Sequence, residues 1–187
     1  MKIDGVVLAG GASSRMGGYK PLVPFRGATL IETVIVRARP QVMRLALDVP
    51  RDLEETYRRR FGDIVLADAF DEKLGPLCGI VTGLEWTDAE WLATFPCDTP
   101  FLPADVVAQL ARHANDAPVV AQGAQVFGLW PKSCFAALRT GLESGALRSV
   151  LRAVEALGGT ARLLQTAENA FFNINTPDDL IAAEEFN

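Results

Sequence analysis

A glycine-rich stretch near the start of the chain holds the first residues whose types and spacing suggest chemistry. In LAGGASSRMGGYK (8–20), Gly10 and Gly11 follow the apolar run GVVLA (5–9), which predicts a buried strand. Glycines let backbone amides approach a nucleotide closely, and exposed amides in a turn bind anions. Arg15 and Lys20 add positive charges suited to phosphates. The stretch predicts a phosphate-binding loop, and the alternative is a glycine-rich surface turn with two solvated cations.

This loop differs from two common phosphate loops. It has no Gly-Lys pair, as G-x-x-x-x-G-K-[ST] requires, and Ala12 stands where G-x-G-x-x-G needs its second glycine. The sequence therefore supports neither a P-loop fold nor a dinucleotide-binding fold.

An aspartate follows a predicted strand in FPCDTPFLPADVV (95–107). Asp98 would lie at the carboxyl end of that strand, where ligands bind in open parallel sheets. Mg²⁺ prefers one or two carboxylates together with phosphate oxygens and water, so Asp98 is the candidate metal ligand. The alternative is that Asp98 only caps the turn before Thr99. Cys97 is expected to be a small packing residue, since no histidine lies nearby in the sequence.

Two asparagines alternate in FFNINTPDDL (171–180) near the end of the chain. If residues 170–175 form a strand, Asn173 and Asn175 lie on one face and can hydrogen-bond a polar ligand. Thr176 and Asp179 have the spacing of a capping box and predict that a helix follows.

The elements that position these residues alternate between strand and helix. Thr29 and Glu32 have capping-box spacing, Pro103 suits the first turn of a helix, and Gln122-Gly123 predicts a tight turn between two strands. The alternation predicts one α/β domain over 1–187, with an open, mostly parallel sheet and helices on both faces. Strands are expected at 5–9, 43–49, 63–68, 90–98, twice within 117–130, 161–166 and 170–175, and helices at 29–39, 52–61, 76–86, 103–113, 132–142, 146–158 and 176–186.

Composition excludes several classes of function. The net charge of the 187 residues is −5 and no basic stripe occurs, so we expect no nucleic-acid partner. No apolar run approaches the roughly 20 residues of a membrane helix, and the polar N-terminus does not resemble a signal peptide, so we expect a cytoplasmic protein. Three cysteines without C-x-x-C spacing predict neither structural zinc nor disulfides. His113, the only histidine, leaves no material for histidine triads.

The first loop resembles the L-A-G-G-x-S-x-R-M-G-x-x-K signature of nucleotidyltransferases. Those enzymes transfer a nucleotidyl group from a nucleoside triphosphate on a three-layer, Rossmann-like sheet of the nucleotide-diphospho-sugar transferase type. The first loop together with LGPLCGI (74–80), PCDTPFLP (96–103) and FFNINTPDDL resembles the molybdenum cofactor guanylyltransferase family in order and spacing. That resemblance implies transfer of GMP from GTP to molybdopterin, with release of pyrophosphate. The related cytidylyltransferases share the first loop but usually differ at the two later blocks.

The resemblance also implies roles for particular residues. Arg15 and Lys20 would hold the triphosphate, Asp98 would bind Mg²⁺, and Asn173 and Asn175 would face molybdopterin. Nucleotide contacts are implied for Leu8, Ala9, Gly10, Gly11, Asp48 and Asp68.

Two features depart from the family pattern. Asp48 stands where the family often has asparagine, and a carboxylate only accepts hydrogen bonds whereas an amide also donates them. In addition, QGAQV (122–126) replaces a longer polar turn that carries an arginine and a proline thought to face the acceptor. The short turn leaves open an altered acceptor, or an acceptor site completed by a partner.

The predicted reaction is an in-line attack by the terminal phosphate of molybdopterin on the α-phosphorus of GTP. It needs positioning and charge neutralisation rather than a protein nucleophile, and we assign these tasks to Lys20, Arg15 and Asp98. A molybdoenzyme or another cofactor-biosynthesis protein is a possible partner. The alternatives are a nucleotidyltransferase with another acceptor, one with CTP as donor, or a non-catalytic GTP-binding escort of the cofactor.

Overall fold

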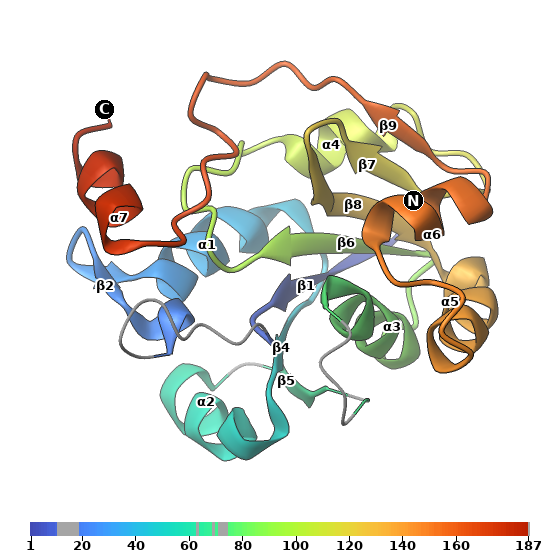
Figure 1. Ribbon diagram of the computed structural model, residues 1–187, viewed down its shortest axis with the longest axis horizontal. Coiled ribbons are helices and arrows are strands. Elements are labelled where there is room, and N and C mark those ends of the chain that lie inside the picture. Colours follow the sequence, from blue (N-terminus) through green and yellow to red (C-terminus); the bar gives the residue numbers. More distant parts are fainter. Residues whose placement is uncertain (11–18, 63, 69, 71–74, 187) are drawn as a thin grey trace.

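The computed structural model describes residues 1–10, 19–62, 64–68, 70 and 75–186. Within these residues, seven strands form one sheet in the order β5-β4-β1-β6-β8-β7-β9 (Figure 1). Every neighbouring pair is parallel except the two pairs that include β8. The prediction of a mostly parallel sheet is therefore confirmed. The strands are β1 (Ile3–Leu8), β4 (Leu45–Val49), β5 (Ile64–Ala67), β6 (Trp91–Pro96), β7 (Val119–Ala121), β8 (Ala124–Pro131) and β9 (Thr160–Arg162).

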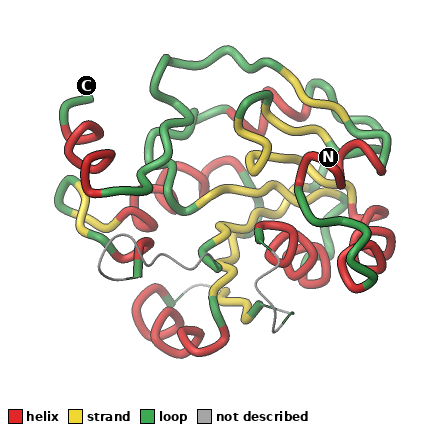
Figure 2. The backbone as a smooth tube through the Cα atoms, viewed as in Figure 1, coloured by secondary structure: helices red, strands yellow, loops and turns green. Residues whose placement is uncertain are grey.

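Helices cover both faces of the sheet, as the alternation of strands and helices predicts (Figure 2). One face packs against α1 (Leu30–Ala38), α2 (Glu54–Phe61) and α4 (Val106–Ala111). The other face packs against α3 (Pro76–Trp86), α5 (Phe135–Glu143) and α6 (Val150–Ala156). Because side chains alternate along a strand, consecutive residues of one strand enter different cores.

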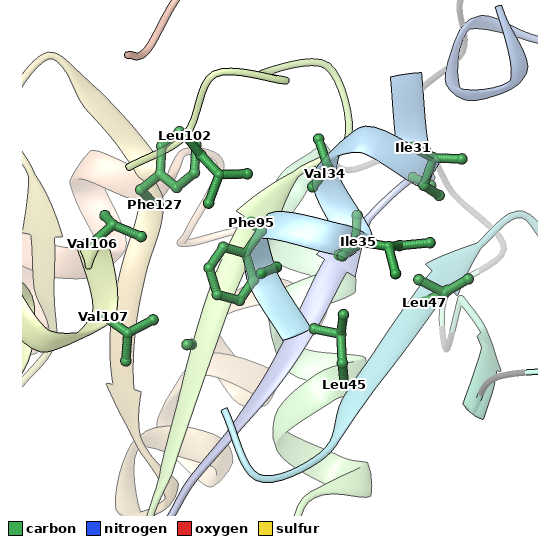
Figure 3. Packing of buried hydrophobic residues seen from close by; sticks show 14 of the residues in the cluster. Ile31, Val34, Ile35, Leu45, Leu47, Phe95, Leu102, Val106, Val107 and Phe127 are labelled. Atoms are coloured by element: carbon green, nitrogen blue, oxygen red, sulfur yellow. The ribbon is translucent and has the colours of Figure 1, made fainter. Parts of the chain in front are cut away.

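The larger core lies between α1, α4 and the strands. Figure 3 shows Val34 and Ile35 of α1 beside Leu45 of β4 and Phe95 of β6. The apolar residues of α1 recur at helical spacing, which places them on the face turned toward the sheet. This packing holds β1, β4 and β6 together, and the carboxyl ends of these three strands carry the candidate site.

Short 3₁₀ segments and one hairpin complete the connections. They are η2 (Lys20–Leu22), η3 (Arg39–Gln41), η4 (Arg51–Leu53), η5 (Lys132–Cys134) and the antiparallel pair β2 (Pro24–Phe25) and β3 (Ala28–Thr29). Both predicted capping boxes are confirmed, at the start of α1 and of α7 (Pro177–Glu184). The tight turn between β7 and β8 is also confirmed, because Ala121 pairs with Ala124 and Gly123 has a φ of 80°.

The strand predicted for 170–175 is wrong. Residues 167–172 form turns, and the Ile174 amide bonds to the Asp98 carbonyl at 3.0 Å instead of to a strand of the sheet. The apolar residues that suggested a strand pack in separate places. Phe171 contacts Phe127, whereas Phe172 contacts Phe186 near the C-terminus.

Several boundaries also differ from the prediction. The strand expected at 161–166 is shorter and ends at Arg162 as β9. Helix α4 begins at Val106, so Pro103 precedes the helix and its carbonyl accepts from the Val106 amide. Helix α7 packs against the β2–β3 hairpin through a small core of Phe25, Leu30, Ile174 and Ala183. In the part of the chain that is described, none of the helices is long and apolar enough to cross a membrane.

Candidate active site

The candidate site lies at the carboxyl end of β1, between the ends of β4 and β6. The Ala9 amide donates to the Asp48 carbonyl at 2.8 Å, and the Cys97 amide donates to the Leu8 carbonyl at 3.3 Å. Leu8 and Ala9 are buried and Gly10 is partly exposed. These bonds fix the backbone that leads into the glycine-rich loop. Gly11 and Arg15, predicted as site residues, lie outside the described residues.

Lys20 joins two distant parts of the chain at the end of β6. Its Nζ lies 2.6 Å from Asp98 Oδ2 and 2.7 Å from Asn175 Oδ1. The Lys20 side chain is only 10% exposed and that of Asp98 19%, so both charges are largely removed from water. A buried charge needs a partner of opposite charge, and this pair satisfies that need. The structure therefore brings three of the predicted site residues together.

A threonine that we did not predict as a site residue links the two informative stretches. The Thr99 hydroxyl donates to Asn173 Oδ1 at 2.6 Å and lies 3.3 Å from Asp98 Oδ1. Thr99 is fully buried, whereas Asn173 and Asn175 are exposed. Thr99 thereby orients the Asn173 amide toward the exposed side of the cluster. The sequence signal that could have identified Thr99 is its position directly after Asp98, the candidate metal ligand.

A second group of polar side chains lies on the β4 side of the loop. A Cβ atom added to Gly10 would be 3.4 Å from Oδ2 of both Asp48 and Asp68, so the two carboxylates face the same point. Burial raises the pKa of Asp48 well above its usual value, and the charge of Asp68 raises it further. Burial also raises the pKa of Asp68, although the Phe70 amide and Arg51 oppose this.

A glycine of α3 makes room for Asp48. A Cβ atom at Gly79 would lie 2.3 Å from Asp48 Oδ2 and 2.6 Å from Leu8 Cδ2. Real Cβ atoms do not approach other atoms this closely, so only glycine lets α3 approach the end of β4. The LGPLCGI stretch thus contributes to the site through Gly79, whose lack of a side chain leaves space for Asp48.

A tyrosine that the sequence reasoning missed fixes the far end of the loop. The Tyr19 hydroxyl donates to the Ala9 carbonyl, and the Tyr19 ring meets that of Tyr57 edge to face at 5.8 Å. Burial raises the Tyr19 pKa, so the hydroxyl stays protonated and can donate. The expectation for Cys97 agrees with its surroundings, because it packs against the larger core and burial raises the pKa of its thiol.

The short turn borders a cavity on the β6 side of the site. The cavity has a volume of about 150 Å³ and is lined by Pro96, residues 123–127, Phe171 and Asn173. Small-molecule pockets are typically about 300–1,000 Å³, so this cavity has room for only part of a ligand. Asn173 connects it to the Lys20–Asp98 pair through Thr99.

This site and its topology agree with comparisons to known proteins. The family model of the MobA-like NTP transferase domain matches residues 5–160. A protein of Mesorhizobium japonicum named molybdenum cofactor guanylyltransferase is 43% identical, over 97% of this chain and 94% of its own. One of Rhodopseudomonas palustris with the same name is 38% identical, over 96% and 91%. The chain belongs to the molybdenum cofactor guanylyltransferase family.

The structure agrees with this family assignment. Molybdopterin-guanine dinucleotide biosynthesis protein A from Archaeoglobus fulgidus superposes with a TM-score of 0.84, covering 97% of each chain at 24% identity. That likeness establishes the fold. The resemblance inferred from the four sequence blocks is confirmed, and the chain is a nucleotidyltransferase.

The donor atoms at the Lys20–Asp98 pair suit the Mg²⁺ expected for this nucleotidyltransferase. Among the described residues, no three His, Cys, Asp or Glu side chains cluster as a ready-made metal site. Mg²⁺ rarely requires one, because it binds through one or two carboxylates with phosphate oxygens and water. Asp98 supplies one carboxylate, and the amide oxygens of Asn173 and Asn175 are held nearby by Thr99 and Lys20. The residues present therefore fit the ion.

Proposed function

We infer that this enzyme transfers GMP from GTP to molybdopterin, forming molybdopterin guanine dinucleotide and pyrophosphate. The observation that carries this inference is the full-length relationship to molybdenum cofactor guanylyltransferases. The contacts of Lys20 with Asp98 and Asn175 support it, because they join the nucleotide loop to the two later blocks of the sequence.

In the proposed mechanism, the terminal phosphate of molybdopterin attacks the α-phosphorus of GTP in line with the leaving pyrophosphate. Lys20 neutralises charge on the transferring group, and Arg15 with the loop amides holds the triphosphate. Asp98 would hold the magnesium ion, which when bound neutralises phosphate charge. Preorganised charges of this kind lower the barrier because they need no rearrangement as the transition state forms. Lys20 is preorganised by its contacts with Asp98 and Asn175.

The acceptor is proposed to approach from the side of the small cavity. Asn173 lies both in the cavity lining and next to Thr99, so a ligand there would reach the Lys20–Asp98 pair. Residues 123–127 form much of the lining. Because the cavity is small, we propose that it holds one end of molybdopterin, with the remainder exposed or covered by a partner such as the receiving molybdoenzyme.

Pyrophosphate release tests the proposed function. The purified enzyme would be given Mg²⁺, molybdate-loaded molybdopterin and, in separate reactions, GTP, CTP or ATP. Of the three nucleotides, we expect only GTP to give pyrophosphate release. Release with CTP would assign the chain to the cytidylyl reaction. GTP binding without release would instead favour the non-catalytic escort. Omitting molybdopterin is the control, because release that persists without it would indicate hydrolysis or another acceptor.

A further inference from the structure

A buried and a partly buried carboxyl group, those of Asp48 and Asp68, lie near each other at the carboxyl ends of β4 and β5. Asp48 is 2% exposed, and its Oδ1 has no hydrogen-bond partner among the described residues. The buried Oδ1 of Asp68 also lacks a partner within that part of the chain. A buried polar atom without a hydrogen bond is costly, so two such atoms beside a candidate nucleotide site point to a ligand that satisfies them.

The two groups face the same space. Their Oδ2 atoms are equidistant, at 3.4 Å, from the position that a Cβ atom on Gly10 would occupy. Gly79 keeps the other side of Asp48 clear of side chains. Two carboxylates this close disfavour double ionisation, because burial and mutual repulsion both oppose the second charge.

The surroundings of the two groups differ in charge. Arg51 lies on the Asp68 side, where its Nη2 donates to the Asp68 carbonyl at 3.1 Å, and its charge favours ionised Asp68. Among the described residues no comparable cation acts on Asp48, and its pKa is raised by burial and by the charge of Asp68. The other titratable groups that sense Asp48 are Tyr19 and Cys97, whose own pKa values are raised.

We propose that Asp48 and Asp68 share one proton, which resides on Asp48, and that the neutral Asp48 carboxyl determines nucleotide specificity by offering guanine both a donor and an acceptor. Asp68 remains ionised and only accepts. This role of the pair rests on the proposed function, because it assumes that GTP is the donor nucleotide. A neutral carboxyl supplies one donor beside an acceptor, as an amide does with one of its two N–H groups, so Asp48 can replace an asparagine at a contact that needs one of each.

Charge indicates which end of the nucleotide meets this pair. Lys20 lies on the β6 side of the loop with Asp98, so the phosphates belong there. Asp48 and Asp68 lie beyond β1, on the β4 and β5 side, and the single negative charge of the pair, on Asp68, repels phosphate. The guanine edge presents two donors, the ring N–H and the exocyclic amine, beside the O6 acceptor. Ionised Asp68 accepts from the donors, and the Asp48 O–H donates to the acceptor.

The first test is the pH dependence of GTP affinity in wild type and Asp48→Asn. If the proton is required, wild-type affinity falls by about tenfold per pH unit above the apparent pKa of the pair. Asp48→Asn, which always carries donor hydrogens, keeps its affinity over that range. Ionisation of GTP itself occurs in both titrations, so the ratio of the two dissociation constants isolates the proton on Asp48. A ratio that stays constant with pH overturns the proposal.

Asp68→Asn serves as the matched variant. It removes the neighbouring charge, so the transition in GTP affinity shifts to lower pH while its one-proton steepness remains. An unshifted transition would show that Asp48 titrates alone, which contradicts a shared proton.

Infrared spectroscopy of the ligand-free wild-type enzyme tests for the protonated carboxyl group directly. This measurement needs no GTP and does not depend on whether a variant folds. We expect the carbonyl band of a protonated carboxyl group at neutral pH, which disappears at high pH and is missing in Asp48→Asn. Absence of this band from wild type overturns the proposal even if GTP binds. Failure of GTP to bind at any pH, with the band present, would instead contradict the proposed function.

Discussion

The Nζ atom of Lys20 lies 2.6 Å from Oδ2 of Asp98, although 78 residues separate them in the chain. The contact joins the end of the glycine-rich loop to the end of β6. Asn175 completes the group from a third part of the sequence, at 2.7 Å from the same nitrogen. Because both charges are largely buried, neither side chain can be removed without changing the other's environment.

Replacing Lys20 or Asp98 by alanine is therefore expected to abolish most turnover. On the scale measured for preorganised electrostatic groups, each loss costs about 10²–10³ in rate. The two residues are in contact, so the double variant should lose much less than the product of the two single effects. Single-turnover pyrophosphate release measures this, and Asp98→Asn provides a variant of nearly the same shape.

A surface ion pair gives the matched control for this experiment. Arg59 and Glu55 lie 2.8 Å apart, close to the 2.6 Å of Lys20 and Asp98, but their side chains are 78% and 66% exposed. Arg59→Ala should leave turnover unchanged, since exposed pairs contribute little. Near-normal turnover in Asp98→Ala, with thermal unfolding like that of wild type, would remove Asp98 from the active site.

Tyr19→Phe is expected to weaken GTP binding without preventing folding. The hydroxyl bonds to the Ala9 carbonyl and so joins the residues that flank the loop. A hydrogen bond of this kind is worth about 0.5–1.5 kcal/mol, which corresponds to a roughly 2- to 10-fold rise in the GTP dissociation constant. Calorimetric titration with GTP would measure it. Because this hydrogen bond joins the residues on either side of the loop and does not involve Lys20 or Asp98, we expect the Michaelis constant to change more than kcat.

Tyr57→Phe is the matched control for Tyr19→Phe. Its hydroxyl is buried and lies near that of Tyr19, but it has no partner at ordinary hydrogen-bond geometry among the residues that the structure describes. Removing it takes away an unsatisfied polar group, so stability should stay equal or rise. If Tyr57→Phe weakens GTP binding as much as Tyr19→Phe, the effect of Tyr19→Phe does not come specifically from losing the Ala9 hydrogen bond.

Much of this arrangement could be predicted from the sequence because its signals are local. The apolar runs, the capping boxes and the glycine-rich stretch each depend on neighbouring residues, and they specify the order of strands and helices. The carboxyl ends of parallel strands meet at one edge, so the placement of Asp98 near the loop followed from topology.

The rest depended on contacts between distant residues, which leave no local pattern. Asn173 and Asn175 reach the site because the Ile174 amide bonds to the Asp98 carbonyl, and not because they lie on a strand. The β2–β3 hairpin was missed because each strand has two residues and its turn places Arg26, a residue other than glycine, at a φ of 49°. The orphaned oxygen of Asp48 likewise becomes visible only in three dimensions.

Gly79→Ala is expected to disturb the nucleotide site through Asp48. The new methyl group would lie 2.3 Å from Asp48 Oδ2, so either the carboxyl group or α3 must move. Overpacking of this kind costs about 1–3 kcal/mol of stability, and displacement of Asp48 should also weaken GTP binding. Denaturant unfolding and GTP titration measure the two effects separately.

Gly83→Ala separates the site effect from general strain in α3. Its methyl group would lie 2.8 Å from Leu92 Cδ2 and 3.0 Å from Val6 Cγ1, within the core rather than at the site. We expect a similar loss of stability but unchanged GTP affinity in the folded protein. Equal loss of GTP affinity in both variants would show that Gly79 acts only through the stability of the helix.

Asp4 is expected to stabilise the fold in a pH-dependent way at the opposite end of β1 from the site. Burial alone would raise its pKa, but hydrogen bonds from Arg44 at 2.5 Å and Thr87 at 2.7 Å, with the charge of Arg44, hold it below its usual value. A lowered pKa in the folded state contributes stability above the unfolded value of about 4, and this is lost as pH falls through the folded value. Asp4→Asn should therefore cost about 1.5–3 kcal/mol at pH 7, the range for hydrogen bonds to charged groups.

The difference in unfolding free energy between wild type and Asp4→Asn should shrink as pH falls below about 4, since Asp4 then takes up a proton in the unfolded state before it does in the folded state. Urea unfolding at a series of pH values measures it. Asp88→Asn is the control, because Asp88 lies 3.8 Å from the same Arg44 but its side chain is 93% exposed, and exposed pairs contribute little. A penalty for Asp4→Asn that stays constant down to pH 2 would mean that packing, and not the charge of Asp4, stabilises this end of the sheet.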